Sequence, residues 1–135
     1  MVDIGCGSGR FLIWLAKNSG EKRNYLGLEI RLKNWGLGIY FMYANATVSF
    51  EQIVSSYPGP LSLVTILCPD PHFKKRHHKR RVLQQSLVDS ITKNLCLGGR
   101  VLIQSDVLEV AADMRERWLL DNPMGIRRQE KSMLN

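Results

Sequence analysis

A glycine-rich turn near the start of the chain constrains the fold more than any other feature. Three glycines alternate with other residues between positions 5 and 9. They follow the apolar run at 1–4 and precede an amphipathic stretch at 11–17. Glycines at such a junction let the backbone turn sharply and approach a ligand without obstruction by a Cβ atom. The sequence therefore predicts a strand, a tight turn beside a ligand, and a helix.

Short apolar runs alternate with helical stretches along the rest of the chain, which predicts an α/β fold with a mostly parallel sheet flanked by helices. We expect strands at 1–4, 25–29, 39–43, 61–68 and 100–105. We expect helices at 11–17, about 79–95 and 107–120, and an irregular tail at 121–135. Leucine and isoleucine recur at every fourth position from 83 to 95, and Gly98-Gly99 is a stop signal for that helix.

Length and composition are those of a single globular domain with its own core. Of the 135 residues, 44% are apolar and 23% charged, and no apolar run approaches the roughly 20 residues that cross a bilayer. We therefore expect no membrane association. Three widely spaced cysteines favour a reduced intracellular compartment.

The positive charge of the chain is concentrated in one octapeptide. Residues 74–81 hold six Lys or Arg and no acid, which leaves 13 basic residues to balance 12 acidic ones elsewhere. A single basic patch on a nearly neutral body indicates contact with a polyanion such as a nucleic acid. The alternative is a solvated run of charge without a partner.

The spacing of the glycine turn distinguishes between two kinds of nucleotide ligand. A dinucleotide fold has G-x-G-x-x-G, whereas this chain has G-x-G-x-G followed by Arg10, with Asp3 two residues before the first glycine. This looks like the S-adenosylmethionine motif of Rossmann-like methyltransferases. That cofactor carries an ammonium and a sulfonium and no pyrophosphate, so an acid can attract it. Glu29, at the expected end of the second strand, can accept hydrogen bonds from both ribose hydroxyls, although an exposed strand-end glutamate is the alternative.

The most informative stretch is 67–81, Leu-Cys-Pro-Asp-Pro-His-Phe-Lys-Lys-Arg-His-His-Lys-Arg-Arg. Asp70 follows the fourth strand, at the edge where open α/β sheets bind ligands. Two flanking prolines restrict the backbone of Asp70, as a positioned functional group requires.

Together with 27–31 and 105–107, this block resembles the tRNA (guanine-N7-)-methyltransferase family in its eukaryotic and plant-like form. The resemblance implies a class I, Rossmann-like methyltransferase that moves a methyl group from S-adenosylmethionine to N7 of a guanine in tRNA. It implies cofactor contacts at Asp3, Gly5, Gly7, Glu29, Ile30, Asn45, Ala46 and Leu67, with Asn45 and Ala46 beside the adenine. It implies a catalytic role for Asp70, and contacts with tRNA at Asp70, Lys74, Lys75, Arg76 and Asp106.

Relative to that family, we expect a partial domain, incomplete at both ends and in the helix after the second strand. Only 15 residues separate Glu29 from Asn45, and 32–36 can form little more than one helical turn. An alternative function is therefore a catalytically inactive fragment that binds RNA or a partner. A methyltransferase for small molecules or proteins is a third possibility, which the basic patch disfavours.

Cys68, His72, His77 and His78 do not have the spacing of a structural zinc site, so we expect no metal. The resemblance implies a WD-repeat partner if the chain is of the nuclear form, with a nuclear or cytosolic location. The sequences at 57–60 and 122–127 instead resemble those of the plastid branch, whose members would act alone.

Overall fold

A five-stranded parallel sheet forms the centre of the molecule. The computed structural model describes residues 1–31 and 39–121. The strands lie side by side in the order β3-β2-β1-β4-β5, with bounds Val2–Ile4 (β1), Leu26–Glu29 (β2), Tyr40–Tyr43 (β3), Leu61–Leu67 (β4) and Leu95–Gln104 (β5). All five predicted strands are confirmed. The order reverses between β1 and β4, as in Rossmann-like folds, and ligands bind such sheets outside the carboxyl ends of the strands near that point.

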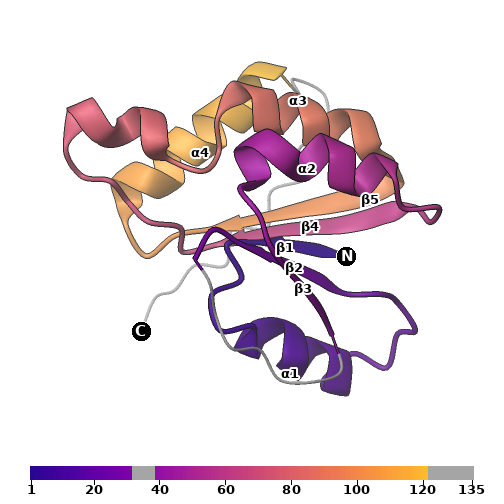
Figure 1. Cartoon of the computed structure of the whole chain (residues 1–135). Helices are drawn as coiled ribbons and strands as arrows, with labels where there is room; N and C mark the ends of the chain where they lie inside the picture. The colour runs from indigo at the N-terminus through magenta and orange to yellow at the C-terminus, as the bar shows by residue number, and fades with distance from the viewer. Residues whose placement is uncertain (32–38, 122–135) are drawn as a thin grey trace.

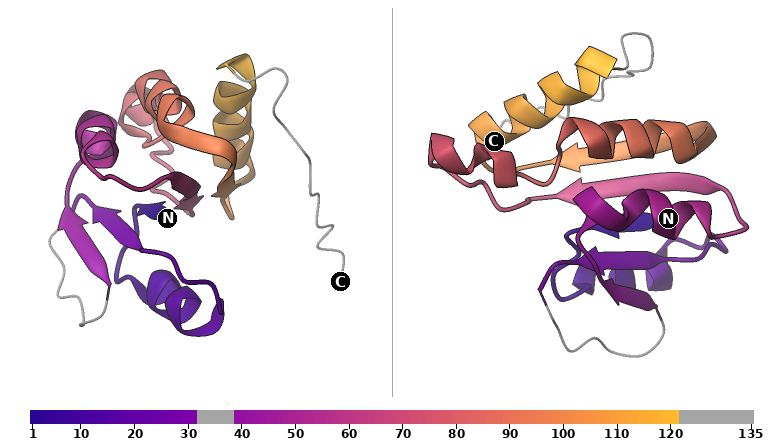
Figure 2. Two further views of the ribbon diagram at one scale, coloured as in Figure 1. Left: turned by 90° about the vertical axis from the view of Figure 1, so that its right-hand side faces the viewer. Right: turned by 45° about the horizontal axis from the view of Figure 1, so that its top comes forward.

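Helices cover both faces of the sheet unequally. Helix α1 (Arg10–Asn18) packs on one face, and α2 (Ala46–Ser55), α3 (Gln85–Asn94) and α4 (Leu108–Asp121) cover the other (Figure 1). The left view in Figure 2 shows α1 on one side of the sheet and the other three helices on the opposite side. A short 3₁₀ helix, η1 (Lys75–Arg80), lies beyond the end of β4.

The main core lies between the sheet and the three-helix layer. Val64 and Ile66 of β4 are fully buried and pack in one cluster with Phe50 of α2, Val88 of α3 and Met114 of α4. On the opposite face a smaller cluster joins Leu12 of α1 to Met1 and Tyr25. Burial on both faces explains why β4 is a nearly continuous apolar run.

Helix α2 was not among the elements that the sequence predicted. Its N-cap is Asn45, whose side-chain oxygen accepts a hydrogen bond of 3.1 Å from the N–H of Thr47. This cap satisfies one of the donors left open in the first turn. Ala46 and Phe50, one helical turn apart, are the residues that the helix buries.

The predicted helix at 79–95 is wrong at both ends. The α-helix begins only at Gln85, because 75–80 form the 3₁₀ helix and the backbone of Arg81, with φ −58° and ψ 139°, is not helical. Leu95 is paired with Leu61 in the sheet, so it begins β5 instead of ending the helix. Gly98, expected as a stop signal, lies inside β5 with a φ of 75°, next to an irregularity in the pairing with β4.

Two predictions fall outside the described residues: the shortened crossover at 32–36, and the irregular tail except for Asp121, which ends α4. In the part that is described, no helix combines the length and apolarity needed to cross a membrane.

Candidate active site at the carboxyl edge of the sheet

The predicted site residues gather at one edge of the sheet. Because all neighbouring strands are parallel, their carboxyl ends meet at the same edge. The glycine turn follows β1, Glu29 ends β2, and Asn45 follows β3. Asp70 follows β4 and Asp106 follows β5. Figure 1 shows these ends on the left, with η1 above them.

Hydrogen bonds to β2 hold the glycine turn in place. The N–H groups of Gly5 and Cys6 donate to the carbonyl of Leu28 at 2.8 and 3.1 Å. Gly5 and Gly7 have φ angles of 74° and 54°, in the left-handed region where a side chain is strained. The turn therefore requires glycine at these positions, as the sequence pattern predicted.

Glu29 is buried and connects the ends of three strands. One carboxylate oxygen accepts a hydrogen bond from the N–H of Gly7, and the other accepts one from the N–H of Arg31, both at 2.9 Å. Its main-chain carbonyl accepts a bond of 3.0 Å from Ala44, just after β3. Each carboxylate oxygen has capacity for a further hydrogen bond, so the same side chain can also accept from a ligand.

Asp3 is a buried carboxyl group, 2% exposed. It is opposite Thr65 in the pairing of β1 with β4, and the Thr65 hydroxyl donates a hydrogen bond of 2.6 Å to it. Burial raises the pKa of Asp3 to about 6, despite the opposing effect of Thr65. Burial, with Asp3 and Glu29 nearby, likewise raises the pKa of the Cys6 thiol to about 12. The interior end of the site therefore disfavours negative charge and favours a cationic ligand.

Asp70 is held by its own loop and by the loop after β2. Its side chain, 53% exposed, accepts a hydrogen bond of 3.2 Å from the N–H of His72. The guanidinium of Arg31 lies 3.7 Å from the other carboxylate oxygen. Arg31 is two residues beyond Glu29, so this ion pair brings the loop after β4 close to the end of β2. Cys68 and His72 have positive φ angles of 46° and 44°, which are costly for residues other than glycine.

The remaining residues predicted to contact the cofactor differ in their exposure to solvent. Ile30 is exposed, Leu67 is half-buried at the end of β4, and Ala46 is buried in the main core. A ligand beside Ala46 would therefore meet its main chain. The side-chain oxygen of Asn45 caps α2.

The basic residues of the octapeptide 74–81 differ in their exposure to solvent. Its Lys and Arg residues at 74–76 and 79–80 are exposed, whereas Arg81 is 4% exposed and lies 2.7 Å from Glu109 of α4. Arg81 therefore differs from the other basic residues of the octapeptide, because its guanidinium faces carboxylates of α4 instead of solvent. Asp106 is exposed at the same edge, between β5 and α4.

The sequence did not indicate Thr65 or Arg31 as side chains of this site, and it indicated Arg81 only as part of the basic octapeptide. A single threonine inside the apolar strand 61–67 was a usable signal, because a buried hydroxyl requires a partner. The ion pair of Arg31 joins loops that are distant in sequence, so no local pattern indicates it.

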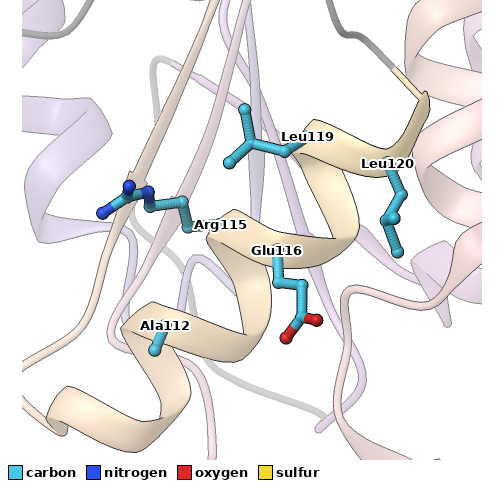
Figure 3. A pocket seen from close by; sticks show the side chains of 5 residues that line it. All are labelled: Ala112, Arg115, Glu116, Leu119 and Leu120. Carbon is cyan, nitrogen blue, oxygen red and sulfur yellow. The ribbon is translucent and has the colours of Figure 1, made fainter.

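A surface depression on α4 is separate from this edge. It has a volume of about 340 Å³, and the described residues that line it all belong to α4, with Arg115 and Leu119 on one side and Glu116 and Leu120 on the other (Figure 3). It contains no predicted site residue. Across residues 1–31 and 39–121, no group of three His, Cys, Asp or Glu side chains is arranged to hold a metal ion.

The strand order, the glycine turn and the buried acids at the carboxyl edge define a Rossmann-like methyltransferase fold. A family model described as "Putative methyltransferase" matches residues 1–134. The chain belongs to the tRNA (guanine-N(7)-)-methyltransferase family, as the following relatives show.

The protein of that name from Synechocystis sp. is 39% identical, and the match covers 93% of this chain and 71% of the relative. The one from Synechococcus sp. strain JA-2-3B'a(2-13) is 46% identical over 87% of this chain and 53% of its own length. The one from Thermosynechococcus vestitus is 37% identical over 99% of this chain and 73% of its own length. The chain thus spans between about half and three quarters of these relatives. The first alignment runs over 154 positions, more than the 135 residues of this chain, so that relative has internal residues without a counterpart here.

Proposed function

We propose that this chain transfers a methyl group from S-adenosylmethionine to N7 of a guanine in tRNA, with the carboxyl edge of the sheet as the active site. The observation that carries the proposal is the ion pair between Asp70 and Arg31. It brings the proline-flanked acid to the end of β2, where Glu29 meets the glycine turn. The names of the relatives support tRNA as the substrate.

The donor set at the glycine turn suits S-adenosylmethionine. Asp3 and Glu29 provide two acids beside a neutral Cys6 thiol, and a ligand with an ammonium and a sulfonium would favour ionised Asp3. Glu29 would accept the ribose hydroxyls, and Gly5 and Gly7 would allow close approach of the backbone. The further contacts we propose are Ile30, Asn45, Ala46 and Leu67. When bound, the cofactor supplies an electrophilic methyl group.

Asp70 would orient and polarise the guanine. N7 of guanine already has a lone pair and no proton, so attack on the methyl group needs no general base. The base becomes cationic as the new bond forms. A carboxylate that accepts hydrogen bonds from N1–H and N2–H would stabilise this charge. The half-exposed position of Asp70, held by the N–H of His72, leaves its carboxylate accessible to a base.

The exposed basic residues would bind the phosphates around the target. Lys74, Lys75 and Arg76 follow directly after the loop that carries Asp70, and their side chains are exposed. Cationic side chains there would release counterions from the RNA and make its affinity dependent on salt. Asp106, at the same edge, would contact the RNA as well. The WD-repeat partner and the plastid location stay predictions from the resemblance.

Calorimetry on the purified chain tests the proposal. We expect saturable binding of S-adenosylmethionine and salt-dependent binding of unmodified tRNA. Retained tRNA binding without any cofactor binding would contradict it and favour the inactive RNA-binding fragment.

A further inference from the structure

Arg81 is the one residue of the basic octapeptide that points into the protein. Its guanidinium lies 2.7 Å from Glu109 and 3.3 Å from Asp113, both on α4. The same group lies 3.2 Å from the ring nitrogen of His78 in η1. The hydrogen bonds to Glu109 and Asp113 raise the pKa of Arg81, so it stays charged. One side chain thus joins α4 to the 3₁₀ helix.

The same guanidinium also binds the loop that carries Asp70. Nε of Arg81 donates a hydrogen bond of 3.0 Å to the carbonyl of Pro71. Pro71 lies between Asp70 and His72, and the N–H of His72 donates back to the Asp70 carboxylate. The φ angles of Cys68 and His72 are unfavourable, and such conformations persist only where surrounding contacts fix them. The hydrogen bond to Pro71 is a contact of that kind.

The charge of Arg81 is not available to a polyanion. Two carboxylates surround it, and its side chain is almost completely buried. Gln84 fixes the local backbone from the other side, because its amide donates to the carbonyls of Arg81 and His78 at 2.7 and 3.2 Å. Residues 74–76, in contrast, are exposed, and none of the ion pairs described for this chain involves their side chains.

We propose that Arg81 is a positioning residue that fastens the loop 69–73 to α4 and so holds Asp70 in place, without contacting RNA. The part of this inference that concerns RNA rests on the proposed function. The part that concerns the loop depends on the structure alone. Because the two acidic residues lie on α4, Arg81 links the position of that helix to the loop.

Hydrogen exchange compares Arg81→Gln with the matched variant Arg76→Gln. The control removes an exposed guanidinium within the 3₁₀ helix, five residues before Arg81. We expect the amides of Asp70, His72 and Phe73 to exchange at least about 10-fold faster in Arg81→Gln, because charged hydrogen bonds contribute about 1.5–3 kcal/mol. We expect no change in Arg76→Gln. Equal exchange in both variants would overturn the proposal. If Arg81→Gln does not fold, Glu109→Gln takes its place, since that side chain is 57% exposed and its loss should loosen the same loop.

Rescue by the conservative variant separates positioning from general stability. Arg81→Lys keeps the charge beside Glu109 and Asp113 but lacks the planar fork that reaches Pro71 at the same time. We expect it to restore the unfolding midpoint toward that of the wild type while loop exchange stays fast. Normal exchange in Arg81→Lys would contradict the proposed hydrogen bond as the cause.

Binding of tRNA and turnover provide the functional comparison. We expect Arg81→Gln to lower kcat about 10-fold while KM for tRNA and the salt dependence of binding stay unchanged. We expect Arg76→Gln to raise KM and to lower the salt slope by about 0.7–0.9. Equal losses of salt slope would show that Arg81 contacts RNA and would overturn the proposal. If no variant and no wild-type chain binds tRNA, the proposed function fails, while hydrogen exchange still decides whether Arg81 fastens the loop.

Discussion

The carboxylate of Glu29 accepts a hydrogen bond of 2.9 Å from the N–H of Gly7, which joins the end of β2 to the glycine turn after β1. Its other oxygen accepts from the N–H of Arg31, whose guanidinium faces Asp70. The proposed cofactor site and the proposed transfer site are therefore linked by Glu29, which ends β2, and by Arg31, two positions further along the chain.

Glu29→Gln should weaken cofactor binding. An amide can accept one of the two main-chain hydrogen bonds, but its NH₂ group then faces the other N–H donor. Loss of a hydrogen bond to a charged group costs about 1.5–3 kcal/mol, so we expect the Kd for S-adenosylmethionine to rise about 10- to 100-fold. Calorimetry measures this. Glu116→Gln, on the exposed surface of α4, is the control and should bind like the wild type. An unchanged Kd in Glu29→Gln would exclude this role of Glu29.

Asp3 should make the stability of the chain depend on pH. Its pKa is about 6 in the folded chain and near 3.8 when unfolded. Between these values the folded chain binds more protons than the unfolded chain, so the free energy of unfolding falls as pH rises from about 4 to 6 and levels off above that. A shift of about two units corresponds to about 2–3 kcal/mol.

Asp3→Asn should remove this part of the pH dependence, since the amide oxygen can still accept from Thr65 and carries no charge. Urea unfolding at pH 4, 5, 6 and 7 measures the free energy. Asp89→Asn, on the exposed side of α3, should keep the wild-type profile. Parallel profiles for the wild type and Asp3→Asn would show that Asp3 does not titrate in this range.

Asp70→Asn should slow methyl transfer without weakening the cofactor. The charge that develops on guanine loses its compensating carboxylate, and removal of one such electrostatic group typically costs about 100- to 1000-fold in kcat. We expect the Kd for S-adenosylmethionine to stay within about twofold of the wild type. Single-turnover methylation and calorimetry measure the two quantities. Normal turnover in Asp70→Asn would show that its charge has no part in the reaction.

Neutralising the exposed basic residues should reduce the salt dependence of tRNA binding. Each phosphate contact contributes about 0.7–0.9 to the slope of log affinity against log salt. The triple replacement Lys74→Gln, Lys75→Gln and Arg76→Gln should therefore lower the slope by about 2 to 3. Filter binding at several salt concentrations measures it. Lys17→Gln, on α1 across the sheet, is the control and should leave the slope unchanged. A slope equal to the wild type in the triple variant would place the RNA elsewhere.

Local patterns in the sequence were sufficient to predict the sheet. Four of the five strands are apolar runs bounded by glycine, proline or polar residues, with the buried β4 as the clearest case, whereas β5 contains two glycines. The glycine turn was also predictable, because left-handed φ angles at Gly5 and Gly7 leave little choice of residue. Residues that follow parallel strands must share an edge, so the grouping of Asp3, Glu29 and Asp70 followed from the topology.

Contacts between distant segments account for what the sequence did not predict. The i+4 pattern from 83 to 95 indicated one long helix, but Arg81 is tied to α4 and Leu95 pairs with β4. The cap at Asn45 is a local signal for α2 that was read only as a ligand contact. The burial of the Arg81 side chain depends on Glu109 and Asp113, which are 28 and 32 residues away, so no local charge pattern indicates it.

Methylation of unmodified tRNA with labelled S-adenosylmethionine decides whether this chain catalyses the proposed reaction, when the labelled nucleoside is identified after complete digestion. We predict 7-methylguanosine as the product, with the label strongly reduced when Asp70→Asn replaces the wild-type chain. Label on another atom or another base, or no label from a chain that binds both substrates, would contradict the claim.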